Sequence, residues 1–146
     1  MIKDKLDLKI IKFLKENSRA SYAHIGREIG LSASAVGERV QRLEDTGVIK
    51  KYVTIIDAKK MGFSVSAYIL MSIDSKHFHH FMDTLESFPE IEQCSRVTGE
   101  NCLIIKVVVK DSDHLQEVID RLTPYGNPST QVILSDIIAN SSKIID

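Results

Sequence analysis

The chain has 146 residues, of which 43% are hydrophobic and 27% charged. This composition is typical of a folded globular protein and excludes a disordered one. The net charge of −1 is unevenly distributed, because residues 1–60 carry a net +5 and residues 61–146 a net −6. A basic front half can bind phosphates and an acidic rear half cannot, so we expect two parts with different functions. The lack of an apolar run of about 18 residues and of a signal-like N-terminal segment predicts a cytoplasmic protein.

A first helix is predicted over residues 4–17. Leu6, Ile10 and Leu14 recur there at helical spacing. The lysines Lys9, Lys12 and Lys15 fall on its outer face and are interpreted as solvent-exposed. This helix is expected to pack against the two helices that follow.

Residues 21–47 predict two helices joined by a tight turn. The first ends at Gly30, which can adopt the left-handed conformation that terminates helices. Ser32 is a good N-cap for the second. Val36, Val40 and Leu43 then form one buried stripe.

The exposed face of this second helix mixes short and charged side chains. Short residues let the backbone approach a DNA major groove, while Arg39 can reach a guanine edge and Arg42 a phosphate. The pattern is that of a helix-turn-helix, although any helical hairpin shares it. Glu38 is expected either to contact a base or to pair with Arg42 one turn on. Gly37 weakens the helix or allows close approach to a groove wall, and the sequence does not decide which.

Residues 48–57 are β-branched and lack helix signals, which predicts a wing or connecting strand. A polar linker follows over residues 57–62. From Ser64 onward, strands are predicted at 65–73, 91–97, 102–109 and 130–138. One helix is predicted to begin near Ser75 and to be ended by Pro89. A second is predicted to be capped by Ser112 and to end before Pro124. The β-α-β-β-α-β order is the ferredoxin-like plan, an antiparallel sheet with both helices on one face.

The third predicted strand is apolar on both faces. Leu103, Ile105 and Val107 alternate with Ile104 and Val108, interrupted by Lys106. An exposed apolar sheet face usually has a partner. We therefore expect sheet-on-sheet dimerisation through this part.

Taken together, the chain resembles the Lrp/AsnC family of transcriptional regulators, in particular its LrpC-like branch. The residues that carry the resemblance are Asp4-x-x-Asp7-x-x-Ile10-Ile11-x-x-Leu14, Arg19-Ala-Ser-Tyr-Ala, Gly30-Leu-Ser-Ala-Ser-Ala-Val, Glu38-Arg-Val-x-Arg-Leu-Glu-x-x-Gly-Val-Ile49 and, less tightly, Val97-Thr-Gly99.

The resemblance implies an α+β protein in which a winged helix-turn-helix precedes a ferredoxin-like domain. The implied organisation is a DNA-binding domain over 1–50, a connecting strand and linker over 51–62, and a dimerisation and effector-binding domain over 63–146. The implied function is a promoter-binding transcriptional regulator that is not an enzyme. Its expected partners are double-stranded DNA, further copies of itself up to tetramers or octamers, and a small-molecule effector such as an amino acid. The implied DNA-binding residues are Tyr22, Ser32, Ser34, Ala35, Glu38, Arg39, Arg42 and Lys50.

One departure from the family pattern concerns the effector. Members that bind amino acids carry an acidic residue three positions after the turn glycine, where it holds the ligand's ammonium group. Here Gly99 is followed by Glu100-Asn101-Cys102, and a thiol cannot replace a carboxylate as partner for a cation. The positions at which an effector is still expected are Thr98, Gly99, Glu100, Asn101, Cys102, Thr130 and Ser135.

Two other functions are compatible with parts of the sequence. His77 and His80, with His79 between them, have a spacing that could chelate a metal, but a further ligand in register is required. No nucleophile, P-loop or dinucleotide motif is present, and neither cofactor nor metal is expected. Cys94 and Cys102 are expected to be reduced and buried. The second alternative is an architectural protein that bends or wraps DNA with little sequence preference and no effector.

Overall fold

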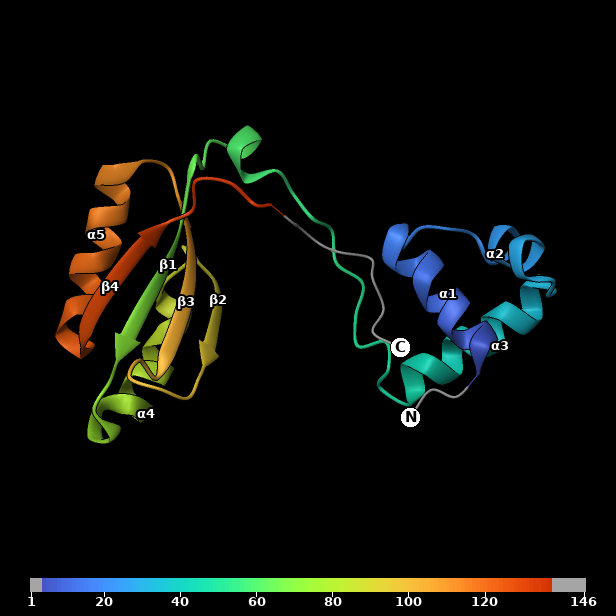
Figure 1. Cartoon of the computed structure of the whole chain (residues 1–146), viewed down its shortest axis with the longest axis horizontal. Coiled ribbons are helices and arrows are strands. Elements are labelled where there is room, and N and C mark those ends of the chain that lie inside the picture. Colours follow the sequence, from blue (N-terminus) through green and yellow to red (C-terminus); the bar gives the residue numbers. More distant parts are fainter. Residues whose placement is uncertain (1–3, 138–146) are drawn as a thin grey trace. The chain divides into compact units, whose positions relative to one another are not determined.

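The structure is a computed structural model that describes residues 4–137. The described residues fall into two compact units, a front unit of residues 4–55 and a rear unit of residues 56–137 (Figure 1). No described helix is both long enough and apolar enough to cross a membrane. Each unit is built around its own hydrophobic core.

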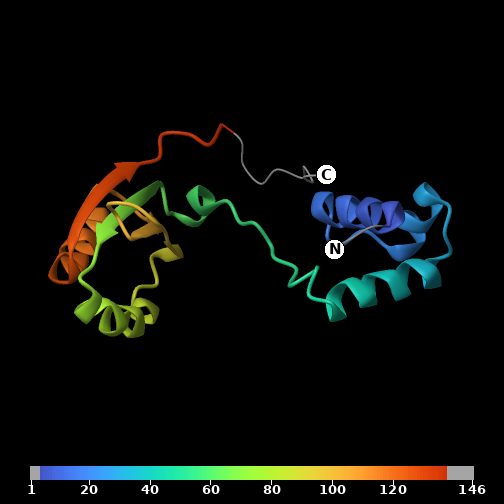
Figure 2. The same cartoon turned by 60° about the horizontal axis from the view of Figure 1, so that its bottom comes forward.

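The front unit contains three helices, α1 (Lys5–Glu16), α2 (Tyr22–Ile29) and α3 (Ala33–Asp45), as predicted (Figure 2). Each helix is preceded by a residue whose side chain accepts a hydrogen bond from a backbone amide of the first turn. These residues are Asp4, Ser21 and Ser32, respectively. Such caps satisfy amide groups that lack partners in the first turn. The buried core consists of Ile10, Leu14, Ile25, Val36, Val40 and Leu43.

The strand predicted over residues 48–57 is wrong for this chain. Residues 50–57 have no regular secondary structure, and a short 3-10 helix, η1 (Ala58–Met61), follows them. β-branched residues favour extended backbone, but a strand also needs a neighbouring strand with which to form hydrogen bonds. Residues 4–137 provide none at this place, so this described part of the chain forms no wing. Instead, the hydroxyl of Tyr52 donates to Glu44 at 2.8 Å, which attaches this segment to α3.

The rear unit is the predicted ferredoxin-like fold. Its elements are β1 (Val65–Ser72), α4 (Ser75–Thr84), β2 (Ile91–Arg96), β3 (Leu103–Val109), α5 (Ser112–Leu122) and β4 (Asn127–Val132), with the short 3-10 turns η2 (Leu85–Ser87) and η3 (Thr123–Tyr125). The strands form one antiparallel sheet in the order β2-β3-β1-β4 (Figure 1).

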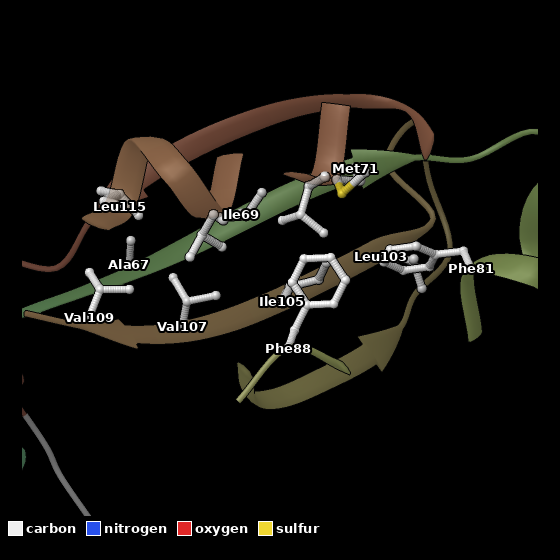
Figure 3. Close-up of a cluster of buried hydrophobic side chains, with 12 residues drawn as sticks. Ala67, Ile69, Met71, Phe81, Phe88, Leu103, Ile105, Val107, Val109 and Leu115 are labelled. Carbon is white, nitrogen blue, oxygen red and sulfur yellow. The ribbon is translucent and has the colours of Figure 1, made fainter. Parts of the chain in front are cut away.

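One face of the sheet carries the core. Ile69 and Met71 of β1 and Ile105 of β3 are fully buried there with Phe81 of α4 (Figure 3). Val118 and Leu122 of α5 complete the same cluster. The other face bears Tyr68, exposed, and the half-buried Leu70, Ile104, Lys106 and Val108. Both helices therefore cover one face and leave the other open.

The last strand is displaced from its predicted position. β4 occupies 127–132 rather than 130–138, and Ile138 lies outside the described residues. The displacement has a physical reason. Pro128 has no amide to donate to a neighbouring strand, so the sequence argues against a strand there. β4 lies at the edge of the sheet, where a proline is tolerated. The cap of α5 also differs, since Asp111 rather than Ser112 accepts from the amide of His114.

Candidate nucleic-acid interface and effector region

The turn between α2 and α3 is closed by glycine. Gly30 has the left-handed φ of 76° that ends α2, and the amide of Leu31 donates to the carbonyl of Gly26 at 2.9 Å. A Cβ at Gly26 would come closer than 3.0 Å to the carbonyl oxygen of Leu31, a separation that side chains do not adopt. Gly26 is therefore required for the tight turn. Its position inside a helical pattern was the available sequence signal.

The exposed face of α3 lies opposite its buried stripe. Ser34, Glu38, Gln41, Arg42 and Asp45 are exposed, and Ala35 is half-buried. Ser32 Oγ accepts from the amide of Ala35 at 3.1 Å and lies 3.0 Å from Ser34 Oγ. The first two turns of α3 thus present short side chains, as predicted. Sequence reasoning did not single out Gln41, although its place one turn beyond Glu38 puts it on the same stripe.

Arg39 turns toward α1 and is three-quarters buried. Its Nη1 donates to Asp4 at 2.5 Å and to Asp7 at 2.8 Å. Arg42 Nη2 donates to the second oxygen of Asp7 at 2.7 Å, although 58% of its side chain stays exposed. The hydrogen bond from Arg39 lowers the pKa of Asp4, and the bonds to Asp4 and Asp7 raise the pKa of Arg39. Both arginines thus fasten α3 to α1.

The expected alternative for Glu38, an ion pair with Arg42, is not among the ion pairs of residues 4–137, where Arg42 pairs with Asp7. Tyr22 is 42% exposed, and its ring lies 3.4 Å from where a Cβ at Gly37 would stand. Gly37 therefore accommodates an adjacent ring at ordinary contact distance. This neighbour was not apparent from the sequence.

Lys50 is exposed and lines a groove of about 690 Å³ between the end of α1 and residues 48–55. Lys15, Arg19 and Lys51 line the same groove, together with apolar residues such as Ile11 and Val53. Several cations around one groove favour an anionic partner.

The candidate effector residues lie at the end of the sheet where β2 turns into β3. Thr98, Gly99 and Glu100 are exposed, with Gly99 at a φ of 121°. The sulfur of Cys102 accepts from the amide of Ile73 at 3.2 Å and lies 3.6 Å from the carbonyl oxygen of Met71. The hydroxyl of Ser72 donates to the carbonyl of Glu100. The turn is therefore fastened to the end of β1.

The two remaining effector candidates lie apart from this turn in the sheet register. Thr130 of β4 pairs with Ile69, two positions before Met71 along β1, and shares the face that the helices cover. Ser135 is exposed and follows β4 instead of belonging to it. The β4 residue paired with Ser72 is Asn127, which sequence reasoning missed because the strand was placed too late.

A second buried carboxylate, Glu90, precedes β2. Arg121 donates to it through two nitrogens at 3.1 and 2.8 Å, and His114 Nε2 lies 3.2 Å from the same carboxylate. Burial raises the pKa of Glu90, but the hydrogen bonds from Arg121 and His114 outweigh it and lower the pKa to about 2. Within residues 4–137, no three His, Cys, Asp or Glu side chains are grouped to hold a metal.

Comparison with known proteins covers both units. A family model described as an AsnC-type helix-turn-helix domain matches residues 4–44, and one described as an Lrp/AsnC ligand binding domain matches residues 66–142. The chain is 36% identical to the HTH-type transcriptional regulator LrpC of Bacillus subtilis, over 92% of this chain and 93% of that protein. It is 30% identical to LrpB of the same organism, over 92% and 90%.

Solved structures agree with these matches. The structure of B. subtilis LrpC has a TM-score of 0.89, covering 94% of this chain and 99% of that one. The transcriptional regulator NMB0573 of Neisseria meningitidis, solved as an L-Met complex, has a TM-score of 0.91 at 24% identity, covering 98% and 97%. At that identity the second likeness shows a shared fold.

Proposed function

This chain belongs to the Lrp/AsnC family of transcriptional regulators, and we propose that α3 is the helix with which it enters the DNA major groove. The observation that carries the proposal is the face of α3 around the exposed Ser34 and the half-buried Ala35. Its side chains are short, and it follows the tight turn that requires Gly26. Glu38 accepts from a base edge and the exposed part of Arg42 donates to a phosphate, while Tyr22, Ser32 and Lys50 contact the DNA backbone. The groove cations Lys15, Arg19 and Lys51 support the phosphate role of Lys50.

The test is a mobility-shift titration against the upstream region of the protein's own gene and against random duplex, each at two salt concentrations. A Ser34→Glu variant places a negative charge on the proposed contact face and is expected to abolish binding to both duplexes. Ser87→Glu is the matched control, since Ser87 is exposed in the rear unit. Unimpaired binding by Ser34→Glu would contradict the proposal.

The base contact by Arg39 remains a prediction, and the ion pairs of Arg39 with Asp4 and Asp7 compete with it. Arg39 would have to exchange its bonds to Asp4 and Asp7 for a guanine edge. If it does so, Arg39→Ala weakens specific binding by about 1–3 kcal/mol while binding to random duplex changes little. Equal losses on both duplexes would make Arg39 a phosphate contact.

The rear unit provides the proposed dimer interface. Leu70, Ile104 and Val108 lie on the open face of the sheet, where a second copy of the sheet can cover them. The same unit matches a ligand-binding family model, which supports an effector site within it. The turn of residues 98–102 remains our proposed position for that site. The relatives are transcriptional regulators, which supports a non-enzymatic, cytoplasmic protein.

A second function, architectural wrapping of DNA, is favoured by one observation. Both α3 arginines are bonded to α1 carboxylates, which reduces the number of groups free to read bases. The titration above separates the two functions. Specific regulators commonly prefer their sites by about a thousandfold or more, whereas an architectural protein binds both duplexes alike.

A further inference from the structure

The base-reading capacity of α3 rests on its exposed stripe, because its two arginines are bound to α1. This stripe contains Ser34, Glu38 and Gln41, which recur at i, i+4 and i+7 and face away from the buried Val36 and Val40. Seven residues of helix span about 10 Å, the length of about three base-pair steps. Side chains on this stripe can therefore address successive base pairs in one groove.

Among the three stripe residues, Gln41 has the side chain whose donor and acceptor best match those on the edge of a base. Its Nε2 donates to Asp45 Oδ1 at 2.9 Å, one turn further along α3. A carboxylate only accepts hydrogen bonds, so the amide nitrogen must face Asp45. The amide has two N–H groups, and Asp45 occupies one of them. The second N–H and the carbonyl oxygen remain, and this donor and acceptor match N7 and N6 of adenine.

We propose that Gln41 determines sequence specificity by reading an adenine in the major groove, with Asp45 as the positioning residue that fixes its amide. The proposal rests on the proposed function, since it requires α3 to lie in the groove. The proposal also gives Asp45 a function close to DNA, where its negative charge alone would only weaken binding. Glu38, one turn before Gln41, can accept from a cytosine amino group at a neighbouring base pair.

The experiment selects bound sequences from a pool of randomised duplexes and sequences them for the full-length wild type and for Gln41→Ala. Wild type is expected to enrich an A·T pair at a defined position of each half-site. Gln41→Ala is expected to lose that preference by about 5- to 150-fold, with unchanged affinity for the unselected pool. Alanine favours helix, so the variant should fold. Gln116→Ala, on the exposed face of α5, is the matched control.

The positioning role of Asp45 has its own readout. Asp45→Ala should weaken the preference at the same base pair as Gln41→Ala, and the double variant should lose no more than Gln41→Ala alone. A purely structural effect of Asp45 would lower affinity for all duplexes equally.

Three outcomes would overturn the inference. If wild type and Gln41→Ala enrich the same sequence, Gln41 does not read a base, while the proposed function stands. If Gln41→Ala loses affinity for every duplex alike, Gln41 contacts phosphate. If wild type binds the pool without enriching any sequence, the inference and sequence-specific regulation both fail, and the architectural function is supported.

Discussion

The carboxylate of Asp7 in α1 accepts a hydrogen bond from the guanidinium of Arg39 in α3 at 2.8 Å. Its other oxygen accepts from Arg42 at 2.7 Å. Asp7 is only 5% exposed, and a carboxylate so removed from water is stable when its oxygens are paired. The α3 helix is therefore held to the rest of the front unit by charge as well as by its buried stripe of Val36, Val40 and Leu43.

Replacing Asp7 should destabilise the front unit. In Asp7→Asn, both arginines lose an ionic acceptor beside the core, and we expect the free energy of unfolding to fall by about 1–3 kcal/mol. Urea unfolding followed by far-UV circular dichroism measures the loss. Glu28→Gln, an exposed neutralisation in α2, is the control and should change little. Equal effects of the two variants would show that Asp7 is not a structural anchor.

The two helical glycines of the front unit should respond oppositely to alanine. Gly26→Ala forces a Cβ against the Leu31 carbonyl, and we expect a loss of about 1–3 kcal/mol, as for other overpacked sites. Gly37→Ala meets Tyr22 at ordinary contact distance and should gain up to about 1 kcal/mol of helix propensity. Thermal unfolding of both variants is the measurement. A stable Gly26→Ala protein would contradict the described turn geometry.

Glu90 should make the stability of the rear unit depend on pH at acid values. Its folded pKa of about 2 lies below the unfolded value of 4.5. The stabilisation is therefore fully present above about pH 4.5 and is lost as the pH falls toward 2. Urea unfolding at pH 7 and pH 3 should show a smaller pH effect in Glu90→Gln than in wild type. Glu117→Gln, exposed on α5, should retain the wild-type pH effect.

Cys102 should determine whether amino acids bind. The thiol offers no carboxylate to an ammonium group, so we expect a panel of L-amino acids to leave the Tm of wild type unchanged. Cys102→Asp provides the charge while its oxygen can still accept from the amide of Ile73, and we expect a rise in Tm with at least one amino acid. Cys102→Ser is the neutral control. A wild-type response would place the ammonium partner elsewhere, with Glu100 as the nearest candidate.

The open sheet face should fail to dimerise when it carries an unpaired charge, since its own Lys106 is paired with Glu92 at 2.7 Å. Leu70→Arg places an unpaired cation beside Ile104, its partner across the sheet, which we expect to raise the dimer dissociation constant about a hundredfold or more. Light scattering after size-exclusion chromatography reports the mass. Gln116→Arg on the outer side of α5 is the control. A dimer that survives Leu70→Arg would require another interface.

Local signals accounted for most of the fold. Helical spacing, the Ser32 cap and the Gly30 stop are properties of neighbouring residues, so the three front helices and the β-α-β-β-α-β order were predictable. Pairing partners are not local. The segment 50–57 has strand composition but no neighbouring strand in the described chain, and β4 begins earlier than predicted because an edge position tolerates Pro128.

The candidate site was predictable as a surface but not as a set of contacts. Exposure of Ser34 and Glu38 follows from the helical period. The direction of Arg39 depends on where α1 places Asp4 and Asp7, more than thirty positions away in the sequence. The need for Gly26 likewise arises only when the turn brings the Leu31 carbonyl against it.

The pairing of Arg39 and Arg42 with α1 also bears on how DNA affinity responds to added salt. Log Kobs falls with log salt by about 0.9 for each phosphate that a protein cation neutralises, because condensed counterions leave the DNA. An arginine already neutralised by an internal carboxylate displaces few of them. A linear salt titration should therefore yield a slope set by groups such as Lys50 and Lys51, smaller than the front unit's full complement of cations would give. The protein would then discriminate among sequences over a wider range of ionic strength than its basic composition suggests.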